Sequence, residues 1–168
     1  MATNKVFSLK LKDVKWLWLF SIVLALVFDT MILLSAQVHY APSVTLLVLI
    51  FWMTQVFEQT HLLTAFVLGL LFDAILASPL GAHALLFVTL GFMILRVRQS
   101  FKAFPIWQQS LIVTVYYGVF QGLSWLLLSP NLPGYSALFY LLEPLFAGLL
   151  WPFLMALLTR LTQSMLFR

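Results

Sequence analysis

Long apolar segments, separated by short polar breaks, run through most of the chain. Their hydropathy and lengths predict six membrane-spanning helices, at residues 16–36, 43–57, 62–77, 80–95, 106–128 and 136–159. The first segment follows a lysine-rich head, as the core of a signal peptide does. Its 21 residues exceed the about 7 to 15 of such a core, so we expect it to be retained as a helix.

The second, third and fourth segments are short for a bilayer. The 16 residues of the third and of the fourth segment rise only about 24 Å as a helix, against a hydrocarbon core of roughly 30 Å. Four spans, with the third and fourth segments as a re-entrant hairpin, therefore remain an alternative to six.

Charge placement favours six spans. All nine basic residues lie before the first segment, between the fourth and fifth, or after the sixth. With six crossings these places share one side, which the positive-inside rule assigns to the cytoplasm. We expect a basic cytoplasmic N-terminal segment at 1–15, a transmembrane domain at 16–160 and a short cytoplasmic tail at 161–168, with both termini inside.

Composition supports the same class. The chain is 63% hydrophobic and 8% charged, which excludes an ordinary soluble domain and predicts an all-α integral membrane protein. The absence of cysteine excludes disulfides, a thiolate nucleophile and a cysteine metal site. The net charge of +4 sits at segment ends rather than in a patch, so no nucleic-acid partner is expected.

The most specific stretch lies at residues 65–86. Ala65, Gly69, Asp73 and Ala77 recur every four residues, so on a helix they form a narrow stripe of small side chains around one acid. The sequence Pro79-Leu80-Gly81 then breaks the helix, and His83 opens the next segment. This stripe predicts close approach of a neighbouring helix.

Three acids lie inside apolar segments: Asp29, Asp73 and Glu143. The rise per residue places all three in the outer half of the membrane, where His83 could pair with Asp73 and His39 with Asp29. We favour hydrogen bonds that fix helix packing; a proton or substrate site is the alternative. No nucleophile elbow, HExxH motif or phosphate-binding glycine loop is present, so we predict no catalytic, cofactor or metal residues.

Segments five and six add weaker signals. Gly118 and Gly122 have the spacing of close helix contacts, and Pro144 and Pro152 should bend the sixth segment twice. The complete set of candidate packing or partner-binding residues is Asp29, Pro42, Trp52, Gly69, Asp73, Leu80, Gly81, His83 and Glu143.

The order of these features resembles the MreD family of bacterial rod shape-determining membrane proteins. The resemblance rests on Pro42 ahead of LLVLIFW, on AFVLGLLFDAILASPLGAHAL, on Trp107-Gln108-Gln109 and on Leu150-Trp151-Pro152. It implies an inner-membrane scaffold without catalysis that binds MreC and works with MreB, the RodA glycosyltransferase and its partner transpeptidase. It also implies a fold similar to the substrate-binding component of energy-coupling-factor transporters.

Other hypotheses stay open at this stage. A small-molecule-binding or transport component would need a pocket of roughly 300 Å³ or more that opens to the periplasm. An intramembrane hydrolase would need two acids, or an acid and a histidine, within hydrogen-bond reach. A homodimer is a further arrangement that the sequence allows.

Overall fold

The structure is a computed structural model that describes residues 11–34, 42–56, 61–128 and 134–166. The described residues form six helices: α1 (Leu11–Leu34), α2 (Val44–Gln55), α3 (Leu62–Leu76), α4 (Ala82–Ala103), α5 (Ile106–Leu128) and α6 (Gly134–Leu166). The all-helical prediction is confirmed for this part of the chain. The predicted head at 1–15 falls largely outside it.

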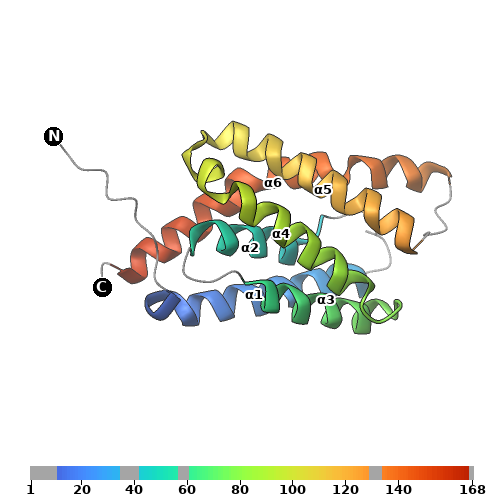
Figure 1. The fold of residues 1–168 in the computed structure, drawn as a ribbon, viewed down its shortest axis with the longest axis horizontal. Coiled ribbons are helices and arrows are strands. Elements are labelled where there is room, and N and C mark those ends of the chain that lie inside the picture. Colours follow the sequence, from blue (N-terminus) through green and yellow to red (C-terminus); the bar gives the residue numbers. More distant parts are fainter. Residues whose placement is uncertain (1–10, 35–41, 57–60, 129–133, 167–168) are drawn as a thin grey trace.

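The helices pair as three antiparallel hairpins, α1–α2, α3–α4 and α5–α6. The ends of α1, α3 and α5 gather at one end of the bundle, here named the hairpin end (Figure 1). The start of α1, the α4–α5 turn and the end of α6 lie at the opposite end, here named the basic end because it carries Lys15, Arg96, Arg98 and Lys102.

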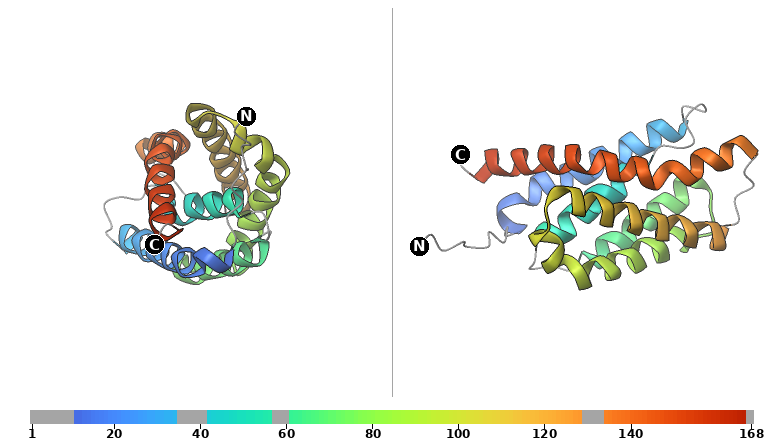
Figure 2. Two further views of the ribbon diagram at one scale, coloured as in Figure 1. Left: turned by 90° about the vertical axis from the view of Figure 1, so that its left-hand side faces the viewer. Right: turned by 90° about the horizontal axis from the view of Figure 1, so that it is seen from above.

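α2 lies in the middle of the bundle. It contacts α1, α4 and α6, and the end-on view in Figure 2 shows it surrounded by the other helices. Ten of its 12 residues, from Thr45 to Thr54, are buried in succession. Because lipid is as apolar as leucine, helices in a membrane associate through packing and hydrogen bonds. A helix covered on every side is therefore held by its neighbours rather than by lipid.

Four of the described helices, α1, α4, α5 and α6, are long and apolar enough to cross a membrane. α2 and α3 have 12 and 15 residues, and so rise only about 18 and 22 Å. The prediction of six helices is thus confirmed, whereas the prediction of six spans is confirmed for four. The re-entrant alternative joined the third and fourth segments, but α4 has 22 residues and the short helices are α2 and α3.

Several predicted boundaries were wrong. The fourth segment was expected to end at Leu95, yet α4 continues to Ala103 and includes three basic residues. A segment predicted from hydropathy ends where charged residues begin. The helix itself continues, because Arg and Lys are good helix formers. α6 likewise runs on to Leu166 and passes through Pro144 and Pro152 without ending.

Candidate functional site

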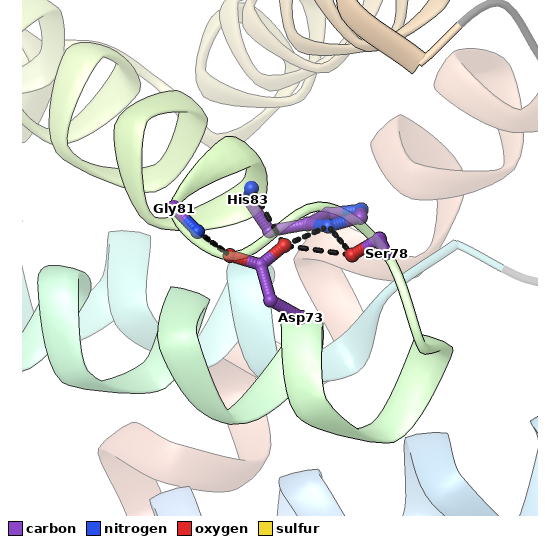
Figure 3. Close-up of polar contacts among 4 residues, drawn as sticks. All are labelled: Asp73, Ser78, Gly81 and His83. Carbon is purple, nitrogen blue, oxygen red and sulfur yellow. Dashed lines mark hydrogen bonds and ion pairs between the residues drawn. The ribbon is translucent and has the colours of Figure 1, made fainter.

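The carboxylate of Asp73 ties α3 to the start of α4 (Figure 3). Its Oδ2 accepts a hydrogen bond from the backbone N–H of Gly81 at 2.7 Å. Its Oδ1 accepts from the Oγ of Ser78 at 2.8 Å and from the backbone N–H of His83 at 3.0 Å, and it lies 2.8 Å from His83 Nδ1. The expected pairing of Asp73 with His83 is therefore confirmed, and Asp73 also satisfies two backbone donors.

The turn between α3 and α4 explains how these groups meet. Ala77 ends α3 with φ of 50° and donates its N–H to the carbonyl of Asp73, as does Ser78 at 3.1 Å. Gly81 then begins α4 with φ of 98°, a conformation that glycine adopts without steric cost. The first N–H groups of α4 face Asp73, and the positive end of the helix dipole favours a carboxylate there.

Asp73, Ser78 and His83 do not have the geometry of a nucleophile triad. In a triad the histidine uses one ring nitrogen for the serine and the other for the acid. Here the Ser78 oxygen and the Asp73 oxygen both lie against Nδ1, at 3.1 and 2.8 Å, and Ser78 also donates to Asp73. This arrangement holds a helix terminus in place and leaves Ser78 without a separate base.

The predicted stripe of small residues holds for three of its four members, whereas Ala77 is exposed and ends α3 in a left-handed conformation. Ala65, Gly69 and Asp73 are all buried. An ideal Cβ on Gly69 would lie 2.5 Å from the backbone nitrogen of Ala84, far inside van der Waals contact. Gly69 is therefore the point at which the backbones of α3 and α4 touch.

Asp29 ties α1 to α2 in a parallel way. Its oxygens accept hydrogen bonds from the Oγ of Ser43 at 2.8 Å and from the backbone N–H groups of Val44 and Thr45, each at 2.9 Å. The N–H of Ser43 in turn donates to the hydroxyl of Tyr117 on α5 at 2.8 Å. Asp29 thus caps the N-terminus of the central helix. His39, its expected partner, lies outside the described residues.

Glu143 ties α6 to α5. Its Oε2 accepts a hydrogen bond from Gln121 Nε2 at 2.7 Å, and the same amide nitrogen donates to the carbonyl of Tyr140. Glu143 and Gln121 are both buried. This contact joins the two helices one residue before Pro144, which cannot donate a backbone hydrogen bond of its own.

The other predicted residues divide between core and surface. Trp52 is fully buried and donates its Nε1 hydrogen to Ser21 on α1 at 2.9 Å. Pro42 is half-buried just before the Ser43 cap. Leu80, in the α3–α4 turn, is 83% exposed, the largest value among the large apolar side chains described.

The spacing of Gly118 and Gly122 indicated a close helix contact without naming the partner helix, and the structure has its tight contact between α5 and α6 at Gly148 instead. An added Cβ would lie 3.9 Å from Pro144 at Gly118 and would meet nothing described within 4 Å at Gly122. At Gly148 it would overlap Thr114 Oγ1 and lie 3.1 Å from the Ser110 carbonyl. A lone glycine gives no spacing signal, so only its position opposite the small residues of α5 could have indicated it.

The three carboxylates therefore serve one structural purpose. Each lies toward the hairpin end and accepts hydrogen bonds from the other helix of its own hairpin. Among the described residues, no group of three or more His, Cys, Asp or Glu side chains could hold a metal ion. The arrangement fits helix packing, which was the favoured interpretation of these acids.

Comparison with known proteins gives the family. The family model described as rod shape-determining protein MreD matches residues 11–161. The chain belongs to the MreD family. A rod shape-determining protein MreD from Haemophilus influenzae is 29% identical over 126 residues, which cover 73% of this chain and 76% of that protein. MreD membership and the long apolar helices indicate a multi-pass membrane protein with a role in rod shape determination.

No solved structure matches the chain. The expected similarity to the substrate-binding component of energy-coupling-factor transporters is therefore not supported. The small-molecule-binding hypothesis rested in part on that similarity and loses that support.

Proposed function

We propose that this protein is a non-enzymatic membrane scaffold of the bacterial cell-wall elongation machinery. It maintains rod shape by binding MreC, and through that assembly it acts with MreB, RodA and the partner transpeptidase of RodA. Membership of the MreD family supports a role in rod shape. The arrangement of the helices supports the proposal that this role is that of a scaffold.

The observation that carries the proposal is the division between inward and outward surfaces. The carboxylates at the hairpin end are engaged in ties between helices of this chain. The outward faces of α1 and α3 are apolar, with Phe20 65% and Leu63 77% exposed. A bundle that uses its polar groups to hold its own shape leaves its apolar helix faces open to lipid or to the helices of a partner, and membership of the MreD family favours a partner.

For the topology we propose six crossings of the inner membrane with both termini in the cytoplasm. The basic end carries the described lysines and arginines of α1 and α4, as the positive-inside rule requires of a cytoplasmic side. The short α2 is compatible with a crossing because the surrounding helices cover it. Cysteines placed singly at Ala2 and Leu80 should label from opposite sides with an impermeant thiol reagent; labelling from the same side would refute this topology.

We place the contact with MreC at the α3–α4 turn, where the exposed Leu80 precedes Gly81, whose N–H is hydrogen-bonded to Asp73. The test is recovery of the tagged chain from its native membrane in mild detergent, with partners identified by mass spectrometry. The wild type should recover MreC and other wall-synthesis proteins. Failure to recover any of them would refute the scaffold proposal.

Two matched variants locate the contact. Leu80→Ser removes an apolar side chain at the proposed contact and should lower recovered MreC about fivefold or more, as loss of a central interface residue does. Leu126→Ser is the control, because Leu126 is 72% exposed near the hairpin end of α5 and lies outside the contact. Equal losses in both variants would contradict the placement at the turn while leaving the scaffold role standing.

A further inference from the structure

A second polar cluster lies at the basic end of the bundle, far from the three carboxylate ties. His61, the residue just before α3, has φ of 52°, makes no capping hydrogen bond with its side chain and is only 4% exposed. Within the described part of the chain, both of its ring nitrogens lack a hydrogen-bond partner. A buried imidazole in this state loses its hydrogen bonds to water without replacing them, which is uncommon in folded proteins.

Trp18 on α1 shares this property. Its ring centroid lies 5.8 Å from that of His61, with the planes tilted by 33°. Its indole Nε1 is also buried and has no hydrogen-bond partner among the described residues. Two side chains from different helices thus bring unpartnered nitrogens to one place, and the Trp18 nitrogen can only donate.

One positive charge and one helix terminus lie near this cluster. Burial, followed by the charge of Arg98 on α4, lowers the pKa of the His61 imidazole. The neutral ring then has one N–H to donate. His61 also stands at the N-terminus of α3, where the helix dipole is positive and the first backbone N–H groups lack partners within the helix. Donors and positive charge at one point are the features that bind a phosphate group.

Basic residues lie close to this cluster along the chain, as at a lipid headgroup. Lys15 lies one turn before Trp18 on α1, and Arg96 and Lys102 flank Arg98 on α4. Outward-facing apolar side chains lie next to the cluster on α1 and on α3: Trp16 is 73% exposed and Leu63 is 77% exposed. A headgroup at His61 would therefore lay its acyl chains along α1 and α3.

We propose that Trp18, His61 and the N-terminus of α3 form a binding site for the phosphate group of an anionic phospholipid in the leaflet at the basic end. A headgroup that enters between α1 and the start of α3 would supply phosphate oxygens to these two buried N–H groups, and Arg98 supplies long-range attraction. The site is separate from the MreC contact proposed at the opposite end.

Native mass spectrometry of the detergent-solubilised full chain tests this proposal. The protein is titrated in turn with dioleoyl phosphatidylglycerol, dioleoyl phosphatidylcholine and inorganic phosphate. We expect phosphatidylglycerol to bind most tightly. Trp18→Phe, which keeps the ring but removes the donor, should weaken that binding about tenfold, as loss of a hydrogen bond to a charged group does.

Trp16→Phe is the matched control, because it changes a tryptophan two residues away that faces outward. It should leave binding unchanged. His61→Gly removes both ring nitrogens and tolerates the positive φ, so it should also weaken binding without straining the backbone. If it fails to fold, the comparison of Trp18→Phe with Trp16→Phe still decides.

Equal phosphatidylglycerol affinity in the wild type and Trp18→Phe would overturn the proposal. Binding of inorganic phosphate that depends on Trp18, without preference for phosphatidylglycerol, would overturn the lipid assignment. Equal binding of the two lipids would overturn the requirement for an anionic headgroup.

Discussion

Replacing Asp73 with alanine removes the acceptor for four donors at once. The backbone N–H of His83 is buried and loses its partner outright, which costs about 1–3 kcal/mol. The N–H of Gly81 lies in a half-buried turn that water can reach, so its loss costs about 0.5–1.5 kcal/mol. Ser78 and His83 Nδ1 already lie 3.1 Å apart and can bond to each other. We therefore expect Asp73→Ala to lower the free energy of unfolding by about 2–4 kcal/mol.

The measurement is reversible unfolding in mixed micelles with increasing SDS, followed by circular dichroism. Asp73→Asn removes the charge but keeps the shape of the side chain. Its carbonyl oxygen can still accept a hydrogen bond from the N–H of His83, whereas its NH₂ group cannot accept one from the N–H of Gly81. It should lose about half as much as the alanine variant. Ser78→Ala is the control and should cost less than about 1 kcal/mol, since it removes one neutral donor.

A loss below about 0.5 kcal/mol in Asp73→Ala would refute the reasoning, because a working helix cap contributes more than that. Such a result would mean that water replaces the carboxylate at the start of α4. The role assigned to Asp73 in tying α3 to α4 would then have to be abandoned.

Three further predictions concern packing and capping, and the same unfolding assay checks the two that involve glycine. Gly69→Val should destabilise by about 3 kcal/mol or more, because its Cβ meets the backbone of α4; Gly122→Ala, in open space, should be neutral or slightly stabilising, and an equal loss in both would contradict the contact. Gly148→Ala should destabilise by about 1–3 kcal/mol, and adding Thr114→Ala should restore part of that loss, so strict additivity would argue against their contact. Asp29→Ala should speed amide hydrogen exchange at the first turn of α2, and unchanged exchange there would disprove the cap.

The number and order of the helices could be predicted from hydropathy, because each apolar segment is long enough to be recognised in the sequence. The end of α4 could not be predicted in this way. The apolar segment ends before Arg96, whereas the helix continues to Ala103. Equally, α2 and α3 have similar hydropathy in sequence, yet one is buried on all sides and the other presents Leu63 and Leu71 outward. Which helix becomes central depends on long-range packing that no local pattern records.

The candidate site was predictable where its partners are close in sequence. Asp73 and His83 are ten positions apart across a turn marked by proline and glycine, so their pairing could be expected. The partner of Asp29 was sought among side chains, whereas the structure uses backbone N–H groups at the start of α2. Backbone donors carry no sequence signature. Gln121 was missed for another reason: a polar residue on a separate helix reveals its partner only once the helices are in register.

The carboxylate ties also bear on how the chain is assembled. The bonded residues are separated by 16 positions at Asp29 and Thr45, by 10 at Asp73 and His83, and by 22 at Gln121 and Glu143. Contacts between near neighbours in sequence close quickly, because little loop entropy is lost. Each nascent hairpin can thus neutralise the cost of its intramembrane acid as soon as its second helix leaves the ribosome. We therefore expect the hairpin, rather than the single helix, to be the unit of membrane insertion for this protein.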